Sequence, residues 1–259
     1  MSIEQNLVDL INFLEPEAQI PSDPSQRWRM YRSLVNARMP GEMPADYMEK
    51  ENQLLLAMAE EKGITDLADL EEMEPGIYLW QGDITALRID AIVNAANSQM
   101  LGCFCPCHGC IDNAIHTFAG VELRNECARI MRRQRHLEVT GSAKITPGYN
   151  LPAKYVIHTV GPIIRDRVCS EDREALRACY ESSMRLADQY GLDAIAFCCI
   201  STGEFHFPNR LAAQIAVEIV REYQKSSNLK VVFNVFKDLD RQIYEGLLGK
   251  NRCEEAGDK

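Results

Sequence analysis

From Gly76 onward, short apolar runs alternate with helical stretches, and this alternation restricts the possible folds more than any other feature. The run at 194–200 is apolar at nearly every position, which indicates a strand buried on both faces. Five further runs rich in β-branched and aromatic residues predict strands at 77–80, 91–93, 141–145, 155–157 and 231–236. The pattern predicts an α/β fold in which helices cover both faces of a mixed six-stranded sheet, a three-layer α/β/α sandwich.

The segments between these strands are predicted to be helices at about 112–134, 171–190 and 208–225. Residues 1–70 follow another pattern, because amphipathic stripes are interrupted by five prolines, which predicts several short helices. We therefore predict two units: a helical N-terminal extension at 1–70 that packs on an α/β domain at 71–259.

Length and charge exclude several classes of protein. No segment of the 259 residues approaches the roughly 20 continuous apolar residues that span a bilayer, and the acidic N-terminus does not resemble a secretory signal. We therefore expect a cytoplasmic protein that does not contact membranes. The net charge of −10 argues against nucleic-acid binding, which needs a basic face. A small anionic ligand is still compatible, because backbone N–H groups at a helix start can hold phosphate.

The loop at 102–110 contains four cysteines and one histidine within eight residues: Cys103, Cys105, Cys107, His108 and Cys110. Zinc prefers thiolate and imidazole ligands, and only three or four of these side chains could face one ion. Cysteines in the cytoplasm are usually reduced, and a disulfide between alternate residues would be strained. The loop is thus predicted to bind a metal; a set of merely buried thiols is the alternative.

Other polar residues follow predicted strands, where ligands bind in open α/β sheets. The segment 201–203, Ser-Thr-Gly, precedes a helix that starts near Pro208 and could cradle a phosphate or form an ordinary turn. Asp83 could accept a hydrogen bond from an exocyclic amine such as that of adenine, or could cap a turn. Phe236 could stack on a base or belong to the core. Asn97 could bind a sugar hydroxyl or form an Asx turn.

Six ordered segments of the chain resemble macrodomains, the ADP-ribose-binding fold: 81–84, 93–97, 111–120, 156–162, 201–208 and 234–236. The resemblance spans about residues 76–249. Hydrolase-type macrodomains usually have a compact glycine-rich loop where this chain has its longer Cys/His segment. In this respect, and in its helical N-terminal extension, the chain resembles the zinc-dependent macrodomains of bacteria and fungi.

The resemblance implies a role for individual residues. Asp83 and Ile84 would contact adenine, and Asn234 and Phe236 would close that end of the site. Asn97 and Asp112 would meet the distal ribose. Five residues would wrap the pyrophosphate: Ser201, Thr202, Gly203, Glu204 and Phe205. The implied zinc ligands are Cys103, His108 and Cys110, which leaves Cys105 and Cys107 as non-ligands.

The implied activity is the zinc-dependent hydrolysis that removes mono-ADP-ribose from modified protein side chains, with Asp or Glu esters as the expected linkage. Asp112 would position or activate water while Asn97 holds the ribose, and a zinc ion with three protein ligands would keep a fourth position open. Members of this subclass are often encoded beside a sirtuin-like ADP-ribosyltransferase and a lipoate-carrying protein, which implies an ADP-ribosylated lipoyl carrier protein as the target.

Three alternatives stay open from the sequence. Cys105 or Cys107 could supply a fourth ligand, which would make the zinc purely structural. The protein could be a reader that binds ADP-ribose without cleaving it, although the presence of both Asn97 and Asp112 favours cleavage. It could also be an O-acetyl-ADP-ribose deacetylase. The histidines outside the loop are expected to be packing or surface residues, and His158 in particular to be a buried, hydrogen-bonded imidazole.

Overall fold

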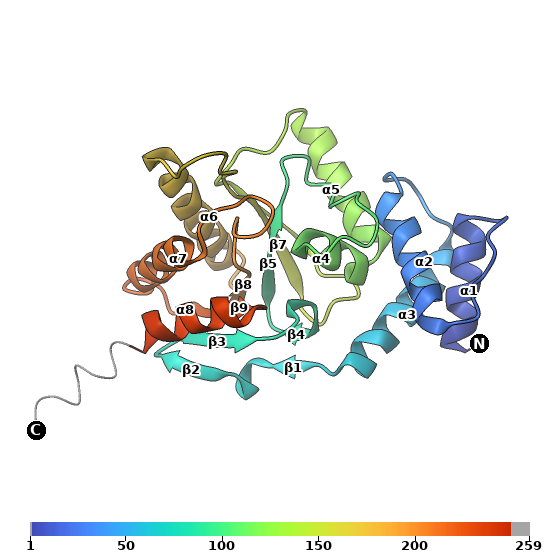
Figure 1. Cartoon of the computed structure of the whole chain (residues 1–259), viewed down its shortest axis with the longest axis horizontal. Helices are drawn as coiled ribbons and strands as arrows, with labels where there is room; N and C mark the ends of the chain where they lie inside the picture. The colour runs from blue at the N-terminus through green and yellow to red at the C-terminus, as the bar shows by residue number, and fades with distance from the viewer. Residues whose placement is uncertain (1, 250–259) are drawn as a thin grey trace, which may run out of the picture.

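The computed structural model describes residues 2–249 (Figure 1). A mixed sheet of seven strands has the order β2-β3-β9-β8-β5-β7-β6. The five central strands are parallel, and β2 and β6 pair antiparallel at the two edges. The strands are β2 (Glu71–Glu74), β3 (Ile77–Gln81), β5 (Ala91–Ala96), β6 (Ala143–Pro147), β7 (Tyr155–Val160), β8 (Ala194–Phe197) and β9 (Lys230–Val235).

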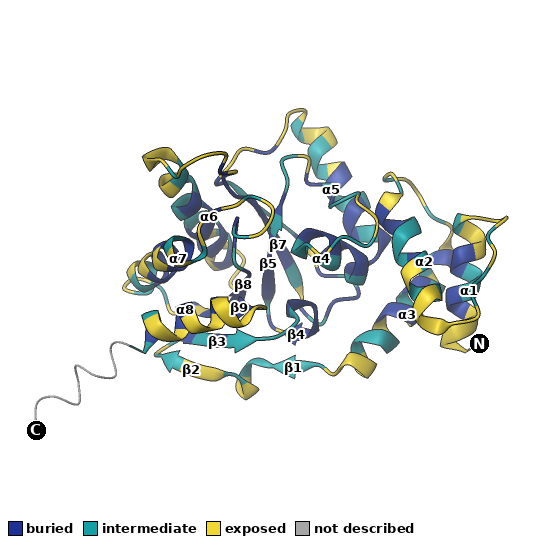
Figure 2. Ribbon diagram, viewed as in Figure 1, coloured by how far each residue is buried: buried dark blue, intermediate teal, exposed yellow. Residues whose placement is uncertain are grey.

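Helices lie on both sides of this sheet, as expected for a three-layer fold (Figure 1). On one side are α4 (Ile111–Ala119) and α5 (Val121–Gln134); on the other are α6 (Ser170–Gln189), α7 (Asn209–Tyr223) and α8 (Asp238–Leu248). The strand β8 is buried at every position, which confirms that it is covered on both faces. Figure 2 shows the buried residues concentrated in the central strands and the exposed ones on the outer helix faces.

The structure corrects four details of the sequence-based prediction. The sheet has seven strands instead of six, because the acidic segment Glu71–Glu74 folds back on β3 as a half-exposed edge strand without an apolar signal. The helix predicted at 112–134 is two helices separated by Gly120, whose φ of +91° favours glycine. The strand predicted at 194–200 ends at Phe197, and the helix α8 was not predicted.

The N-terminal extension contains the helices α1 (Ile3–Leu14), α2 (Pro24–Ala37) and α3 (Ala45–Lys62), which share a small apolar core. The chain then passes through β1 (Thr65–Asp66) and the 3-10 helix η1 (Leu67–Asp69) to β2. A second 3-10 helix, η2 (Ile84–Ala86), precedes the short strand β4 (Leu87–Arg88), which pairs with β1. The helical character predicted for this region is confirmed. The proposed domain boundary near residue 70 stays a prediction, and residues 250–259 of the predicted domain lie outside the described residues.

A buried carboxyl group attaches the extension to the α/β domain. Glu51 on α3 accepts hydrogen bonds from the hydroxyls of Tyr31 at 2.6 Å and Tyr47 at 3.3 Å within the extension. Its other oxygen accepts the backbone N–H of Val121 at 2.9 Å, at the first turn of α5. Since a buried acceptor that loses its partners is costly, Glu51 stabilises the docked position of the extension. Within residues 2–249, no helix combines the length and apolar character needed to span a bilayer.

Candidate active site

Except for Asp112 on α4, the residues predicted to contact ADP-ribose lie at the carboxyl ends of four neighbouring parallel strands, in the order β3, β9, β8 and β5. Asp83 and Ile84 follow β3, Phe236 follows β9, the segment 201–205 follows β8, and Asn97 follows β5. Adjacent strands are about 4.8 Å apart, so this row extends over roughly 14 Å. The strand order thus places the predicted adenine, pyrophosphate and ribose contacts in the order in which these groups are joined in ADP-ribose.

At the β5 end of the row, two asparagine amides hold the carboxyl group of Asp112. Asn94 Nδ2 donates to Asp112 Oδ1 at 2.8 Å, and Asn97 Nδ2 donates to Asp112 Oδ2 at 3.3 Å. Asn94 Nδ2 also lies 3.1 Å from Nδ1 of His158, whose other ring nitrogen lies 3.0 Å from the hydroxyl of Thr146. The prediction of a buried, hydrogen-bonded His158 is confirmed. Burial raises the pKa of Asp112 to about 6, although the Asn94 hydrogen bond opposes this shift.

Asn97 combines the two roles that its sequence position allows. Its Oδ1 accepts the backbone N–H of Gln99 at 2.9 Å, which is the Asx-turn geometry. Its Nδ2 reaches the carbonyl of Gly102 at 3.2 Å in addition to Asp112. One amide therefore connects the start of the cysteine–histidine loop (residues 102–110) with the buried carboxylate.

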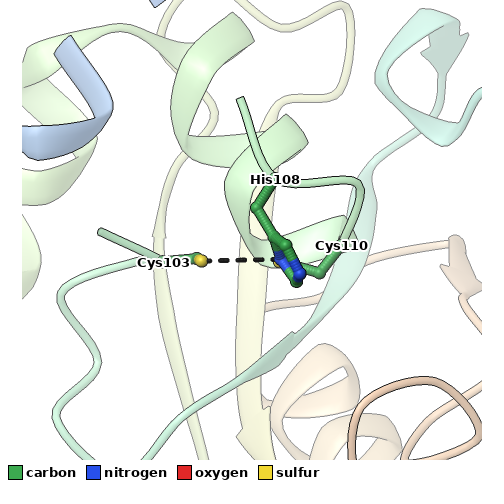
Figure 3. Close-up of side chains that lie close together, drawn as sticks. All are labelled: Cys103, His108 and Cys110. Carbon is green, nitrogen blue, oxygen red and sulfur yellow. Dashed lines mark hydrogen bonds between the residues drawn. The ribbon is translucent and has the colours of Figure 1, made fainter. Parts of the chain in front are cut away.

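Three side chains of the cysteine–histidine loop converge on one point (Figure 3). The ligand atoms of Cys103, His108 and Cys110 all lie within 4.8 Å of one another, and Cys103 Sγ is 3.7 Å from His108 Nδ1. Tetrahedral zinc with ordinary bond lengths separates a sulfur and a nitrogen ligand by roughly 3.6 Å. Both the spacing and the chemistry of these donors therefore fit a zinc ion.

Cys110 lies at the N-cap of α4, where its Sγ accepts the backbone N–H of Asn113 at 3.4 Å. Burial raises the pKa of the Cys110 thiol to about 12, and this hydrogen bond opposes the shift. The N–H groups at the start of the helix favour a thiolate at this position.

The two other cysteines of the loop point elsewhere. Cys105 is exposed, and Cys107 Sγ donates to the carbonyl of Arg29 on α2 at 3.3 Å. Neither belongs to the group formed by Cys103, His108 and Cys110. The ligand set implied by the family resemblance is thus the set that the fold brings together.

The segment 201–205 lies partly beside the cysteine–histidine loop. Glu204, predicted at the pyrophosphate, places Oε1 3.6 Å from Nε2 of His108. Thr202 is half-buried and donates to the carbonyl of Cys199 at 2.9 Å. Gly203 is exposed and Phe205 is half-buried, so these two residues are placed where a ligand could reach them.

Ser201 differs from its neighbours because it is buried and has a φ of +64°. Its side chain lies against Gly161, where an added Cβ would come within 2.0 Å of Ser201 Oγ. Within residues 2–249 this hydroxyl has no hydrogen-bond partner. A buried polar group of this kind calls for a partner such as an anionic ligand.

At the opposite end of the row, Asp83 is both a cap and one member of an ion pair. Its Oδ1 accepts the N–H of Thr85 at 2.9 Å, and its Oδ2 lies 2.6 Å from Nζ of Lys62 at the end of α3. Although partial burial opposes it, the bonds from Lys62 and Thr85 hold the pKa of Asp83 below its usual value. Ile84 is buried beside it.

The two residues predicted to close the adenine end are placed differently. Asn234 is buried and donates to the carbonyl of Gly82 at 3.0 Å, so its amide already serves the fold. Phe236 is 76% exposed, which excludes the alternative that it belongs to the core. An aromatic ring this exposed at a strand end is available for stacking on a base.

Sequence reasoning missed several residues that shape the site. Lys62 and Arg32 belong to the extension and carry no local motif, because only the fold brings them to Asp83 and to the loop. A second group of possible metal ligands, His116, Cys127 and His158, is fully buried behind Asp112. Both ring nitrogens of His158 already face hydrogen-bond partners, so this imidazole serves the fold.

Known proteins share the fold and much of the sequence of this chain. Residues 93–216 match the Macro domain family. A protein-ADP-ribose hydrolase of Treponema medium is 46% identical to this chain, and the match covers 96% of this chain and 100% of that protein. One of Staphylococcus aureus strain MSSA476 is 51% identical, with 86% of it and 87% of this chain covered. A macrodomain of Trypanosoma brucei in complex with ADP-ribose superposes with a TM-score of 0.65 at 30% identity, covering 97% of that chain and 88% of this one.

Proposed function

Since this chain belongs to the macrodomain family, we propose that it hydrolyses the bond between mono-ADP-ribose and a modified protein side chain, that it needs zinc to do so, and that the bond is an ester of Asp or Glu. The relatives that it matches over most of their length are named protein-ADP-ribose hydrolases. An ADP-ribose glycohydrolase of Xenopus laevis is 43% identical over 185 residues, which cover 70% of this chain and 42% of that protein. Zinc dependence and the ester linkage go beyond what these names state.

One observation carries the zinc part of the proposal. The amide of Asn97 bonds both to Asp112 and to the carbonyl of Gly102, directly before the three convergent donors of the cysteine–histidine loop. The residues expected at the distal ribose and the residues suited to a metal therefore share a single contact point. When bound there, a zinc ion would supply Lewis acidity beside the ribose, because three protein ligands leave one coordination position open.

The residues of the chain provide the remaining chemistry. Asn94 and Asn97 hold both oxygens of Asp112, so its carboxylate has a fixed direction and can accept a proton from water. Water attacks the anomeric carbon of the distal ribose, its proton passes to Asp112, and the bond from that carbon to the ester oxygen breaks with its electron pair on the leaving carboxylate. The products are ADP-ribose and the free side-chain carboxylate. The exposed ring of Phe236 and the carboxylate of Asp83 would hold the adenine at the far end of the row.

The chemistry of the leaving group favours an ester linkage. A carboxylate leaves as a stable anion at neutral pH, since its conjugate acid has a pKa of about 4. It needs no proton from a second acidic group, so a site with one oriented carboxylate is sufficient. As the target we propose a lipoyl carrier protein modified by a sirtuin-like ADP-ribosyltransferase, and the support for this target is the resemblance to zinc-dependent macrodomains.

A metal-depletion experiment tests this function. Purified protein is analysed for metal, stripped with a chelator, and assayed for release of ADP-ribose from a glutamate-modified and from an arginine-modified protein. We expect one zinc per chain, release from the ester only, loss of release in the stripped protein, and recovery with added zinc. Full activity of metal-free protein would remove zinc from the mechanism. Tight ADP-ribose binding without release from either substrate would identify a reader.

A further inference from the structure

We propose that the N-terminal extension positions the metal-binding loop: Arg32 and Asn36 of α2 hold the cysteine–histidine loop in the shape that brings Cys103, His108 and Cys110 together. This inference rests on the proposed zinc site and assigns a role to the extension within it. Arg32 and Asn36 are positioning residues, since neither belongs to the group of convergent donors.

The loop has little internal support. Within residues 102–110 the backbone forms one hydrogen bond of its own, from the N–H of His108 to the carbonyl of Cys105 at 3.2 Å. Cys107, which precedes His108, has a φ of +53°, in the left-handed region that non-glycine residues rarely adopt. Such a backbone persists only where its surroundings hold it. The contacts that hold this loop therefore come from outside it.

Arg32 supplies the first of these contacts. Its Nη2 donates to the carbonyl of His108 at 2.8 Å, and Nη2 and Nε donate to Oδ1 of Asn113 at 2.7 and 3.2 Å. A guanidinium group donates in a rigid planar fork, and hydrogen bonds from a charged donor are stronger than those between neutral groups. The orientation of His108 is thereby tied to α2.

Asn113 passes this constraint to the other side of the loop. It is completely buried, and its Nδ2 donates to the carbonyls of Cys105 at 3.0 Å and Cys103 at 3.4 Å. Because a guanidinium group can only donate, Arg32 forces Oδ1 of Asn113 toward itself and Nδ2 toward these carbonyls. Among the described residues, Arg32 is the charged group that bonds to this amide.

Asn36 acts at the strained point of the loop. Its Oδ1 accepts the N–H of Cys107 at 2.9 Å, while its Nδ2 donates to the hydroxyl of Thr117 on α4 at 2.9 Å. Asn36 is almost completely buried, so both bonds are protected from water. The extension thus contacts the loop directly on both sides of the peptide bond that joins Cys107 to His108.

Hydrogen bonds that hold metal ligands from neighbouring residues orient those ligands, and loss of such a bond typically weakens metal binding 10- to 100-fold. The test compares full-length Arg32→Met, Arg32→Lys and Asn36→Ala with the control Asn125→Ala. Asn125 joins the extension to α5 through two hydrogen bonds with Gly41, at 2.9 and 3.0 Å, and its side chain bonds to no residue of the described loop. Zinc affinity is measured by competition with a chromophoric chelator, and the site is also loaded with Co²⁺ to record its thiolate charge-transfer absorption.

We expect Arg32→Met to bind zinc about 10- to 100-fold more weakly and to change the Co²⁺ spectrum, with Arg32→Lys between it and the wild type. Asn125→Ala should lower the melting temperature but keep wild-type zinc affinity. Should Arg32→Met fail to fold, Asn36→Ala provides the same comparison. Wild-type zinc affinity in both Arg32→Met and Asn36→Ala would overturn the inference, whereas a wild-type protein that binds no zinc would overturn the proposed function itself.

Discussion

The two ends of the row of site residues are built in opposite ways. At the β5 end, Asp112 is buried and both of its oxygens accept amide hydrogen bonds, beside a loop held by another part of the chain. At the β3 and β9 end, Phe236 is largely exposed and Asp83 is half-exposed and paired with Lys62. A rigid, buried polar end suits bond cleavage, because pre-oriented groups need no reorganisation during the reaction. An open end suits recognition of a ligand that must enter and leave.

This contrast separates two kinds of mutational effect. Changes at the β5 end should reduce the rate of release while ADP-ribose still binds. Changes at the adenine end should weaken binding while the rate at saturation stays close to that of the wild type.

The largest effect is expected from Cys103→Ala. Loss of one of three donors should abolish zinc retention. Because a metal ion stabilises the transition state by several kcal/mol, the rate of ADP-ribose release should fall by about 1000-fold or more. Single-turnover assays and metal analysis measure both quantities. Cys105→Ala is the matched control, since Cys105 is exposed and lies outside the donor group. Equal losses in the two variants would contradict the three-ligand assignment.

Asp112→Asn should lower the rate of release by about 100-fold or more, the usual contribution of a positioned general base. The amide keeps the size of the side chain, so ADP-ribose binding measured by calorimetry should change much less than the rate. Thermal unfolding of the variant shows whether the buried network survives. If affinity and rate fall together, Asp112 is a binding residue and the two ends of the row do not differ as proposed.

Phe236→Ala tests the open end. Stacking of a base on an aromatic ring contributes about 1–3 kcal/mol, so ADP-ribose affinity should fall about tenfold with the rate at saturation unchanged. Stability should stay the same, because the ring is exposed. Leu239→Ala removes another exposed apolar side chain, from α8, and serves as the control. If the rate of Phe236→Ala at saturating substrate also fell, the adenine end would contribute to bond cleavage and the two ends would not differ as proposed.

The smallest effect is expected from Lys62→Met. This change removes the ammonium group that holds the carboxylate of Asp83 in place. Exposed ion pairs contribute at most about 1 kcal/mol, so ADP-ribose affinity should fall by about fivefold or less. The loss should shrink further as salt is added, because the pair is screened. Titrations at low and high ionic strength measure it. A larger loss, independent of salt, would mean that Lys62 contacts the nucleotide itself.

Much of the architecture could be predicted because its signals are local. The apolar run at 194–200 predicted a strand buried on both faces, and β8 is buried throughout. The edge strand Glu71–Glu74 escaped prediction because it is acidic and pairs along only one edge. Gly120 divides a helix that periodicity alone extends from 112 to 134, since a left-handed residue interrupts the backbone without changing the apolar spacing on either side.

The sequence by itself determined the donor chemistry of the site, because Cys103, His108 and Cys110 lie within one loop and their residue types indicate a soft metal. Only the tertiary structure decided what holds that loop and what lies beside each end of the row. Arg32 reaches His108 across 76 positions, and the order β3-β9-β8-β5 results from strand pairing. Such contacts depend on which surfaces of the chain pack together, and no short segment of sequence encodes that choice.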